Sequence, residues 1–83
     1  MSIEHLVRMA NDIADYFHSG PDRALAVAGV SNHMKKFWDP RMRRQIAAHL
    51  REQGGEGLSE LALEAVVQLT ELDAAKPRRS QVR

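Results

Sequence analysis

Cysteine is absent from this 83-residue sequence, and only four of its residues are aromatic. Without cysteine, neither a disulfide framework nor a thiolate metal site can form. No apolar run approaches the roughly 20 residues that a membrane-spanning helix needs. The N-terminus also lacks the order of basic, apolar and small residues that marks a signal peptide. We therefore expect a soluble, cytoplasmic protein.

The motifs of common active sites are missing as well. There is no glycine-rich dinucleotide or phosphate loop, and no nucleophile motif of the form Gly-x-Ser-x-Gly. His49 and Glu52 share a helix face, but no second His or carboxylate cluster accompanies them. A helical chain of 83 residues also offers little room for a concave pocket. We expect no catalytic residue, no metal ion and no cofactor, and therefore no autonomous enzyme.

Acidic and basic residues are nearly equal in number but strongly segregated. Residues 35–51 hold six Lys and Arg against Asp39 alone, and residues 52–75 hold six Asp and Glu with no basic residue. Residues 76–83 hold four basic residues. Such blocks bias which surfaces are attracted to one another. Two interpretations are open at this point: the first two blocks face each other within the fold, or they face a partner.

Apolar residues recur at helical spacing in four segments, and no segment shows the pattern of a β-strand. The breaks between them fall at Gly20-Pro21, at Trp38-Asp39 before Pro40, and at Gly54–Gly57. The predicted helices are 3–18, 22–37, 40–53 and 60–72. We predict an all-α fold, a small bundle of about four short helices with a disordered basic C-terminal tail. The single helical domain would cover residues 1–74 and the tail residues 75–83.

The most informative stretch joins the second and third predicted helices. Asp39 and Pro40 are typical of a helix start, which makes this junction an ordered corner. The two rings before them are adjacent, so they point in different directions; we expect Phe37 to fill the core and Trp38 to face outward. Trp and Arg are enriched at binding hot spots. The candidate partner-binding residues are Phe37, Trp38, Asp39, Pro40, Arg41, Met42, Arg43 and Arg44. The competing interpretation is that Trp38 belongs to the core.

A helix-turn-helix module that binds nucleic acid is the main alternative. Its recognition helix would begin with Arg41, Arg43 and Arg44. Against it, a phosphate would repel Asp39 in the turn, and the acidic block 52–75 nearly cancels the basic block. A protein partner is therefore the preferred expectation.

Three stretches together resemble the small delta subunit of the cytoplasmic, NAD-dependent, molybdenum-containing formate dehydrogenases. The specific part is Phe37-Trp38-Asp39-Pro40-Arg41-Met42-Arg43, which runs on to His49-Leu50. The other two are Leu6-Val7-Arg8-Met9-Ala10-Asn11-Asp12-Ile13-Ala14, and Gly54-Gly55-Glu56-Gly57-Leu58 followed by Leu61, Ala65-Val66 and Leu69. The resemblance covers about residues 3–70, most of the chain.

The resemblance implies a non-catalytic subunit. In that family the large alpha subunit carries the molybdenum cofactor and iron–sulfur clusters, whereas the beta and gamma subunits carry flavin and further clusters and bind NAD. The delta chain is expected to dock on the large cofactor-bearing subunit in a hetero-oligomer, and to support complex assembly, stability or cofactor retention. We expect the stretch Phe37–Arg44 to make this contact, with Trp38 as the anchor and with Arg41 and Arg43 bound to partner carboxylates.

Overall fold

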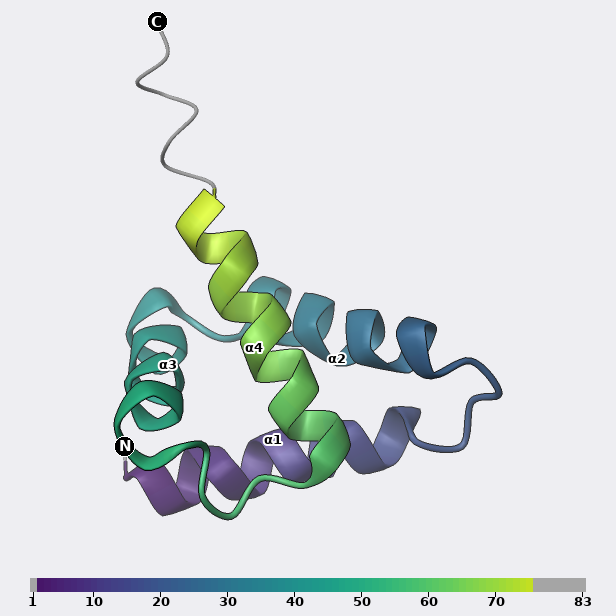
Figure 1. Ribbon diagram of the computed structural model, residues 1–83, viewed down its shortest axis with the longest axis horizontal. Coiled ribbons are helices and arrows are strands. Elements are labelled where there is room, and N and C mark those ends of the chain that lie inside the picture. The colour runs from purple at the N-terminus through teal and green to yellow at the C-terminus, as the bar shows by residue number, and fades with distance from the viewer. Residues whose placement is uncertain (1, 76–83) are drawn as a thin grey trace, which may run out of the picture.

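The computed structural model describes residues 2–75, which form four helices joined by short loops (Figure 1). The helices are α1 (Ile3–Phe17), α2 (Arg23–Phe37), α3 (Pro40–Gln53) and α4 (Glu60–Ala75). The predicted all-α fold is confirmed, and no strand occurs within the described residues. The last helix runs through Ala75, past its predicted end at residue 72. The rest of the predicted basic tail, from residue 76 onward, lies outside the described residues.

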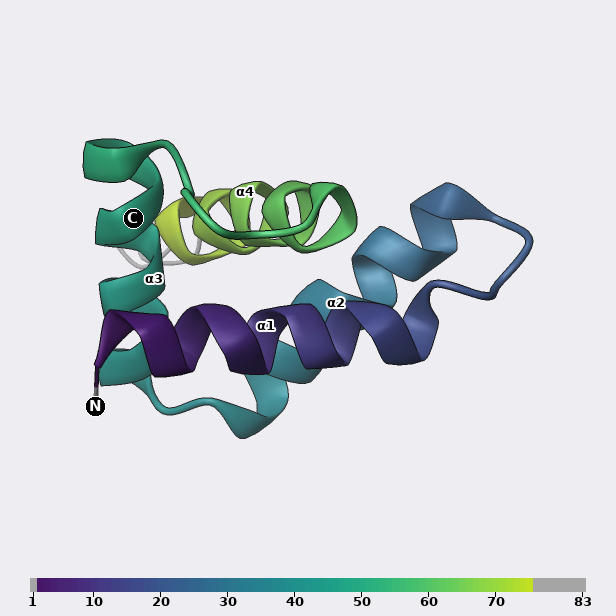
Figure 2. The ribbon, with the colours of Figure 1, turned by 90° about the horizontal axis from the view of Figure 1, so that it is seen from below.

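The four helices pack around one core. α1 and α2 run antiparallel, because only the segment 18–22 joins them, and α4 crosses both and packs mainly on α2 (Figure 1). α3 stands at one end of the bundle, where it contacts α1 and α4 (Figure 2). The α2–α3 junction therefore comes close to the C-terminal part of α4, although about 35 residues separate the two in the sequence.

Side-chain caps explain why the helices begin where they do. Ser2, Asp22 and Asp39 each accept a hydrogen bond from a backbone N–H in the first turn of the helix that follows. The Ser59 hydroxyl accepts in the same way from Ala62 N at 3.3 Å. Each such cap satisfies an N–H that the helix itself leaves without a partner, and contributes about 1 kcal/mol. The helix start predicted at Asp39 and Pro40 is thus confirmed.

The loop before α4 depends on a glycine. Gly55 is buried and has a φ of 75°, and a Cβ at this position would lie 2.5 Å from Leu63 Cδ1. Only glycine fits both the left-handed backbone and the close approach of the leucine side chain. The loop can therefore lie flat against the start of α4.

The core is mainly aliphatic, and many of its side chains are small. Alanines on α1 and α4 leave room for the helices to approach one another closely. Among the described residues, the buried hydrophobic side chains are Leu6, Ala10, Ala14, Ala26, Val27, Val30, Met34, Trp38, Ile46, Leu61, Ala62, Ala65, Val66 and Leu69. Trp38 is the one aromatic side chain in this set, so it contributes the largest single apolar surface to the core.

Candidate functional site: the corner between α2 and α3

The backbone of the corner is fixed by local interactions. α2 ends at Phe37, and α3 begins at Pro40 after two extended residues. The residue before a proline is driven to extended angles, and Asp39 has φ −78° and ψ 166°. Its carboxylate accepts a hydrogen bond from Met42 N at 2.9 Å. Proline and the capping carboxylate together set the direction in which α3 leaves α2.

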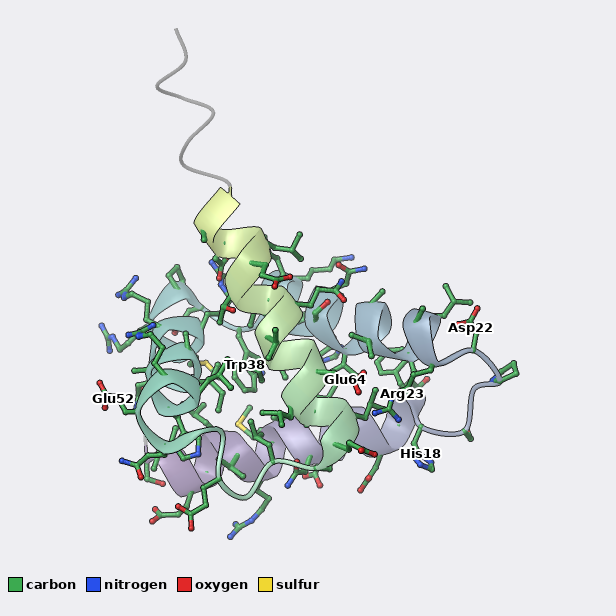
Figure 3. The ribbon with its side chains drawn as sticks, in the orientation of Figure 1. His18, Asp22, Arg23, Trp38, Glu52 and Glu64 are labelled. Atoms are coloured by element: carbon green, nitrogen blue, oxygen red, sulfur yellow. The ribbon has the colours of Figure 1, made fainter. Side chains whose placement is uncertain are left out.

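The two adjacent rings of the corner take opposite places, and the expected assignment of each is wrong. Trp38 is only 5% exposed and lies between α3 and α4 (Figure 3), whereas Phe37 is 66% exposed. Trp38 leaves the helix in an extended conformation, with φ −83° and ψ 141°, which turns its indole inward. Phe37 is still in the last turn of α2, at the margin of the buried face. The core at this end is therefore filled by the indole, and the phenyl ring is left outside.

Arg43 also points inward. Its Nη1 donates to the backbone carbonyls of Lys35, at 3.1 Å, and Trp38, at 3.0 Å. Its Nε lies 3.3 Å from Asp73 Oδ2 in an ion pair, although this contact lacks hydrogen-bond geometry. The side chain is 15% exposed. The guanidinium is thus engaged within the fold, which leaves it little capacity to bind the partner carboxylate expected from the sequence.

Asp73 is the residue of this site that the sequence reasoning missed. Besides its contact with Arg43, its Oδ1 accepts a hydrogen bond from Lys35 Nζ at 2.6 Å. It lies in the last turns of α4, beyond the predicted end of that helix. One carboxylate therefore joins the end of α4 to α2 and to α3. The sequence feature that could have indicated this role is its position: Asp73 is the last acidic residue of the block 52–75, which follows the basic block 35–51.

The outward side of the corner carries exposed basic and aromatic groups. Arg41, Arg44 and Pro40 are exposed, and neither arginine has an ion-pair partner among residues 2–75. Lys36 Nζ lies 5.7 Å from the centroid of the Phe37 ring. A cation at this distance from an aromatic face is weakly attracted to it. The side chains on this side are thus free to contact another molecule.

The eight predicted residues therefore divide into two groups. We name the side chains used within the fold the inner corner: Trp38, Asp39, Met42 and Arg43. We name the exposed side chains the outer corner: Phe37, Pro40, Arg41 and Arg44. Met42 is half-buried and packs on the core, and Asp39 is exposed but caps α3. Of these eight residues, only those of the outer corner are candidates for contact with a partner.

A second ion pair ties α2 to α4 away from the corner. Arg23 donates to the two carboxylate oxygens of Glu64 at 3.3 and 3.1 Å, and Glu60 lies 3.9 Å away (Figure 3). The hydrogen bond with Glu64 raises the pKa of the Arg23 guanidinium. These side chains are about half exposed or more, so the pair contributes little to stability.

A hollow of about 860 Å³ lies between α1, α3 and the loop 54–57. Asn11 holds this loop at its far side: it donates to Gly57 O at 3.0 Å and accepts from Ser59 N at 2.8 Å. His49 Nε2 lies 2.8 Å from Glu56 O, and Glu52 points away from the bundle (Figure 3). His49 and Glu52 thus do not form a site. Within residues 2–75, no three His, Cys, Asp or Glu side chains are placed to hold a metal ion.

Two further findings bear on what the chain does. None of the helices over the described part of the chain has the length and apolar character needed to cross a membrane. The family model described as NADH-dependant formate dehydrogenase delta subunit FdsD matches residues 5–66, which include the whole corner. No curated protein and no solved structure was found to match the chain.

Proposed function

Because the chain belongs to the delta-subunit family of NADH-dependent formate dehydrogenases, we propose that it is a non-catalytic small subunit of a cytoplasmic, molybdenum-containing complex. In this role it docks on the large cofactor-bearing subunit and supports assembly, stability or cofactor retention. The observation that carries the docking role is the outer corner, a junction with an exposed ring and two arginines that have no ion-pair partner within residues 2–75.

Docking is favoured because it would cover the exposed apolar surface of Phe37 and give Arg41 and Arg44 carboxylate partners. Phe37 leaves 66% of its surface exposed, and covering apolar surface gains about 25 cal/mol per Å². Arg41 and Arg44 are three residues apart on α3, so both side chains leave the same face of the helix. A guanidinium can bind a carboxylate through two parallel hydrogen bonds. A partner surface with an apolar pocket and flanking carboxylates would satisfy all three side chains.

The nucleic-acid alternative loses support from the arrangement of the same helix. A recognition helix would present Arg41, Arg43 and Arg44 to the grooves, but Arg43 is bound to two backbone carbonyls and to Asp73. The Trp38 indole, which would lie in the turn, is in the core. The remaining basic groups favour an acidic protein surface instead.

The docking role is tested by reversing the charge of the outer corner. Arg41→Glu with Arg44→Glu should weaken binding to the purified large subunit by about tenfold or more, because attraction becomes repulsion. The helical signal of the free chain should not change, since both side chains are exposed. Arg8→Glu with Arg51→Glu is the control, because it makes the same change in net charge at exposed positions away from the corner. If both double variants bind equally well, the outer corner is not the contact surface.

A further inference from the structure

The C-terminal end of α4 lies beside the corner between α2 and α3 (Figure 1). Asp73 holds the two together, since its carboxylate oxygens lie 2.6 Å from Lys35 Nζ and 3.3 Å from Arg43 Nε. α4 ends at Ala75, two residues further on, which is about 3 Å along the helix axis. The chain therefore passes from α4 into residues 76–83 next to the outer corner.

Positive charge accumulates at this end of the molecule. Residues 35–44 hold five Lys and Arg against one acidic residue, Asp39. The last turns of α4 add two acidic residues, Glu71 and Asp73. Residues 76–83 add four basic residues and no acidic one. Basic residues thus outnumber acidic ones here by nine to three, and most of the excess comes from residues 76–83.

The exposed basic side chains of the corner are not neutralised within residues 2–75. The carboxylate of Asp73 is shared by Lys35 and Arg43, and none of the other basic side chains of residues 35–44 forms an ion pair in this part of the chain. We give the name basic end to these remaining side chains together with the four basic residues that follow α4: Lys36, Arg41, Arg44, Lys76, Arg78, Arg79 and Arg83.

Helix stability does not account for the charges of the basic end. The free N–H groups at the start of a helix disfavour positive side chains, yet Arg41 lies in the first turn of α3 and Arg44 just beyond it. The end of α4 favours a positive charge nearby, but this effect falls off within one turn, so it reaches Lys76 and not Arg83. Like charges gathered at one end also repel one another. Attraction of an anionic partner accounts for all of these charges.

We propose that the basic end draws the chain onto an acidic face of the large subunit before the outer corner makes contact. This inference rests on the proposed function and adds residues 76–83 to the surface that finds the partner. At 0.1 M salt, attraction between opposite charges acts over about 10 Å, which is farther than any direct contact. It raises the association rate of two proteins by about tenfold or more. Eight residues span at most about 28 Å, so all four charges stay near the outer corner.

An acidic protein surface fits the basic end better than a uniformly anionic one. Asp39 and Glu71 are exposed at the same end of the molecule, and both would be repelled by the phosphates of a nucleic acid or of lipid headgroups. A partner protein can place basic side chains opposite these two carboxylates and acidic side chains opposite the arginines. The mixture of signs therefore favours a protein surface with a patterned charge.

The test removes the charge of residues 76–83 and keeps the length of the chain. The test variant carries Lys76→Gln, Arg78→Gln, Arg79→Gln and Arg83→Gln. Its association rate constant with the purified large subunit, measured by stopped-flow fluorescence at low salt, should fall by about tenfold. The rate constant should also depend less on salt concentration than that of the unchanged chain, because less attraction is left to be screened. The dissociation rate constant should change by less than about twofold, since long-range attraction acts mainly on association.

The matched control is Arg8→Glu with Arg51→Glu. It lowers the net charge by the same amount as the test variant, at exposed positions away from the basic end. The association rate of the control should stay close to that of the unchanged chain. An equal fall in both variants would show that net charge alone sets the rate, and would overturn the assignment to the basic end.

The other results separate this inference from the proposed function. If the test variant associates as fast as the unchanged chain while the charge-reversed outer corner binds weakly, the inference is wrong and the docking role stands. If the unchanged chain does not bind the large subunit, both are wrong. A change confined to the dissociation rate would mean that residues 76–83 act by direct contact, which contradicts attraction before contact.

A last measurement tests the class of partner. The unchanged chain should not bind duplex DNA or phosphatidylglycerol vesicles at physiological salt, because both surfaces are uniformly anionic. Binding to either one that disappears in the test variant would assign the charges of residues 76–83 to that partner and overturn the proposal.

Discussion

The inner and outer corners carry nearly the same side chains and differ in what those side chains contact. Each has one aromatic ring, Trp38 inside and Phe37 outside, and each has at least one arginine. Arg43 is held by two backbone carbonyls and Asp73, while Arg44 has no ion-pair partner within residues 2–75. A single eight-residue stretch thus supplies both a structural joint and an exposed surface, and composition alone does not separate the two.

The difference between neighbours follows from backbone direction. Successive residues on a helix are turned by about 100°, so Arg43 and Arg44 leave α3 in different directions, whereas Arg41 and Arg44 share a face. Trp38 lies after the end of α2 and is extended, so the direction of its ring is not set by the 100° rotation per residue that applies up to Phe37. Changing one member of such a pair at a time therefore separates the two sides.

Trp38→Ala should unfold the free chain or nearly do so. Removing a large buried ring costs about 3–5 kcal/mol, and a core in a domain this small supplies little more than about 3–5 kcal/mol of net stability. Thermal melting followed by circular dichroism measures the effect. A variant that kept most of its helical signal and its melting temperature would show that the indole is not a core element.

Arg43→Ala should lower the free energy of unfolding by about 1–3 kcal/mol, because it removes the hydrogen bonds to two carbonyls and the ion pair with Asp73. Urea unfolding gives the value. Arg44→Ala is the matched control one residue away, and should stay within about 0.5 kcal/mol of the unchanged chain because its side chain is exposed. Equal losses in the two variants would remove the distinction between inner and outer arginines.

Much of the fold could be predicted from the sequence, because the position of a helix depends largely on residues close together in the chain. Apolar spacing gave four helices, and Asp39 with Pro40 gave the start of α3 to the residue. The end of α4 was not predictable in this way. Beyond the predicted end of the helix, Asp73 contacts Lys35 and Arg43, which are distant in the sequence, and apolar spacing carries no sign of such contacts.

The site was predictable only in outline. The sequence predicted that one ring of the pair enters the core. Which ring does so depends on the backbone of Trp38, which leaves the helix and becomes extended. The charge blocks show the same limit. The basic block 35–51 and the acidic block 52–75 do face each other. Within residues 2–75, however, every ion pair between the two blocks uses Asp73, and Arg41 and Arg44 form none. The sequence pattern identifies the segment 37–44, but tertiary contacts determine which of its side chains remain exposed.

Phe37→Ala should change the free chain least and the complex strongly. The ring is 66% exposed and lies in the last turn of α2, so its loss should alter the free energy of unfolding by no more than about 0.5 kcal/mol. The contacts it gives up inside the chain are those with the His33 ring and the Lys36 ammonium, both at the surface.

In the complex, the same change should cost at least about 2 kcal/mol of binding free energy, roughly 30-fold in Kd, as expected for an aromatic anchor. Titration calorimetry with the purified large subunit measures it, and Leu25→Ala, also at an exposed position on α2, is the control. Unchanged affinity would show that Phe37 is not the residue that anchors the outer corner to the large subunit. A large loss of stability in the free chain would instead mean that Phe37, like Trp38, belongs to the inner side, because the two rings are distinguished only by what covers them.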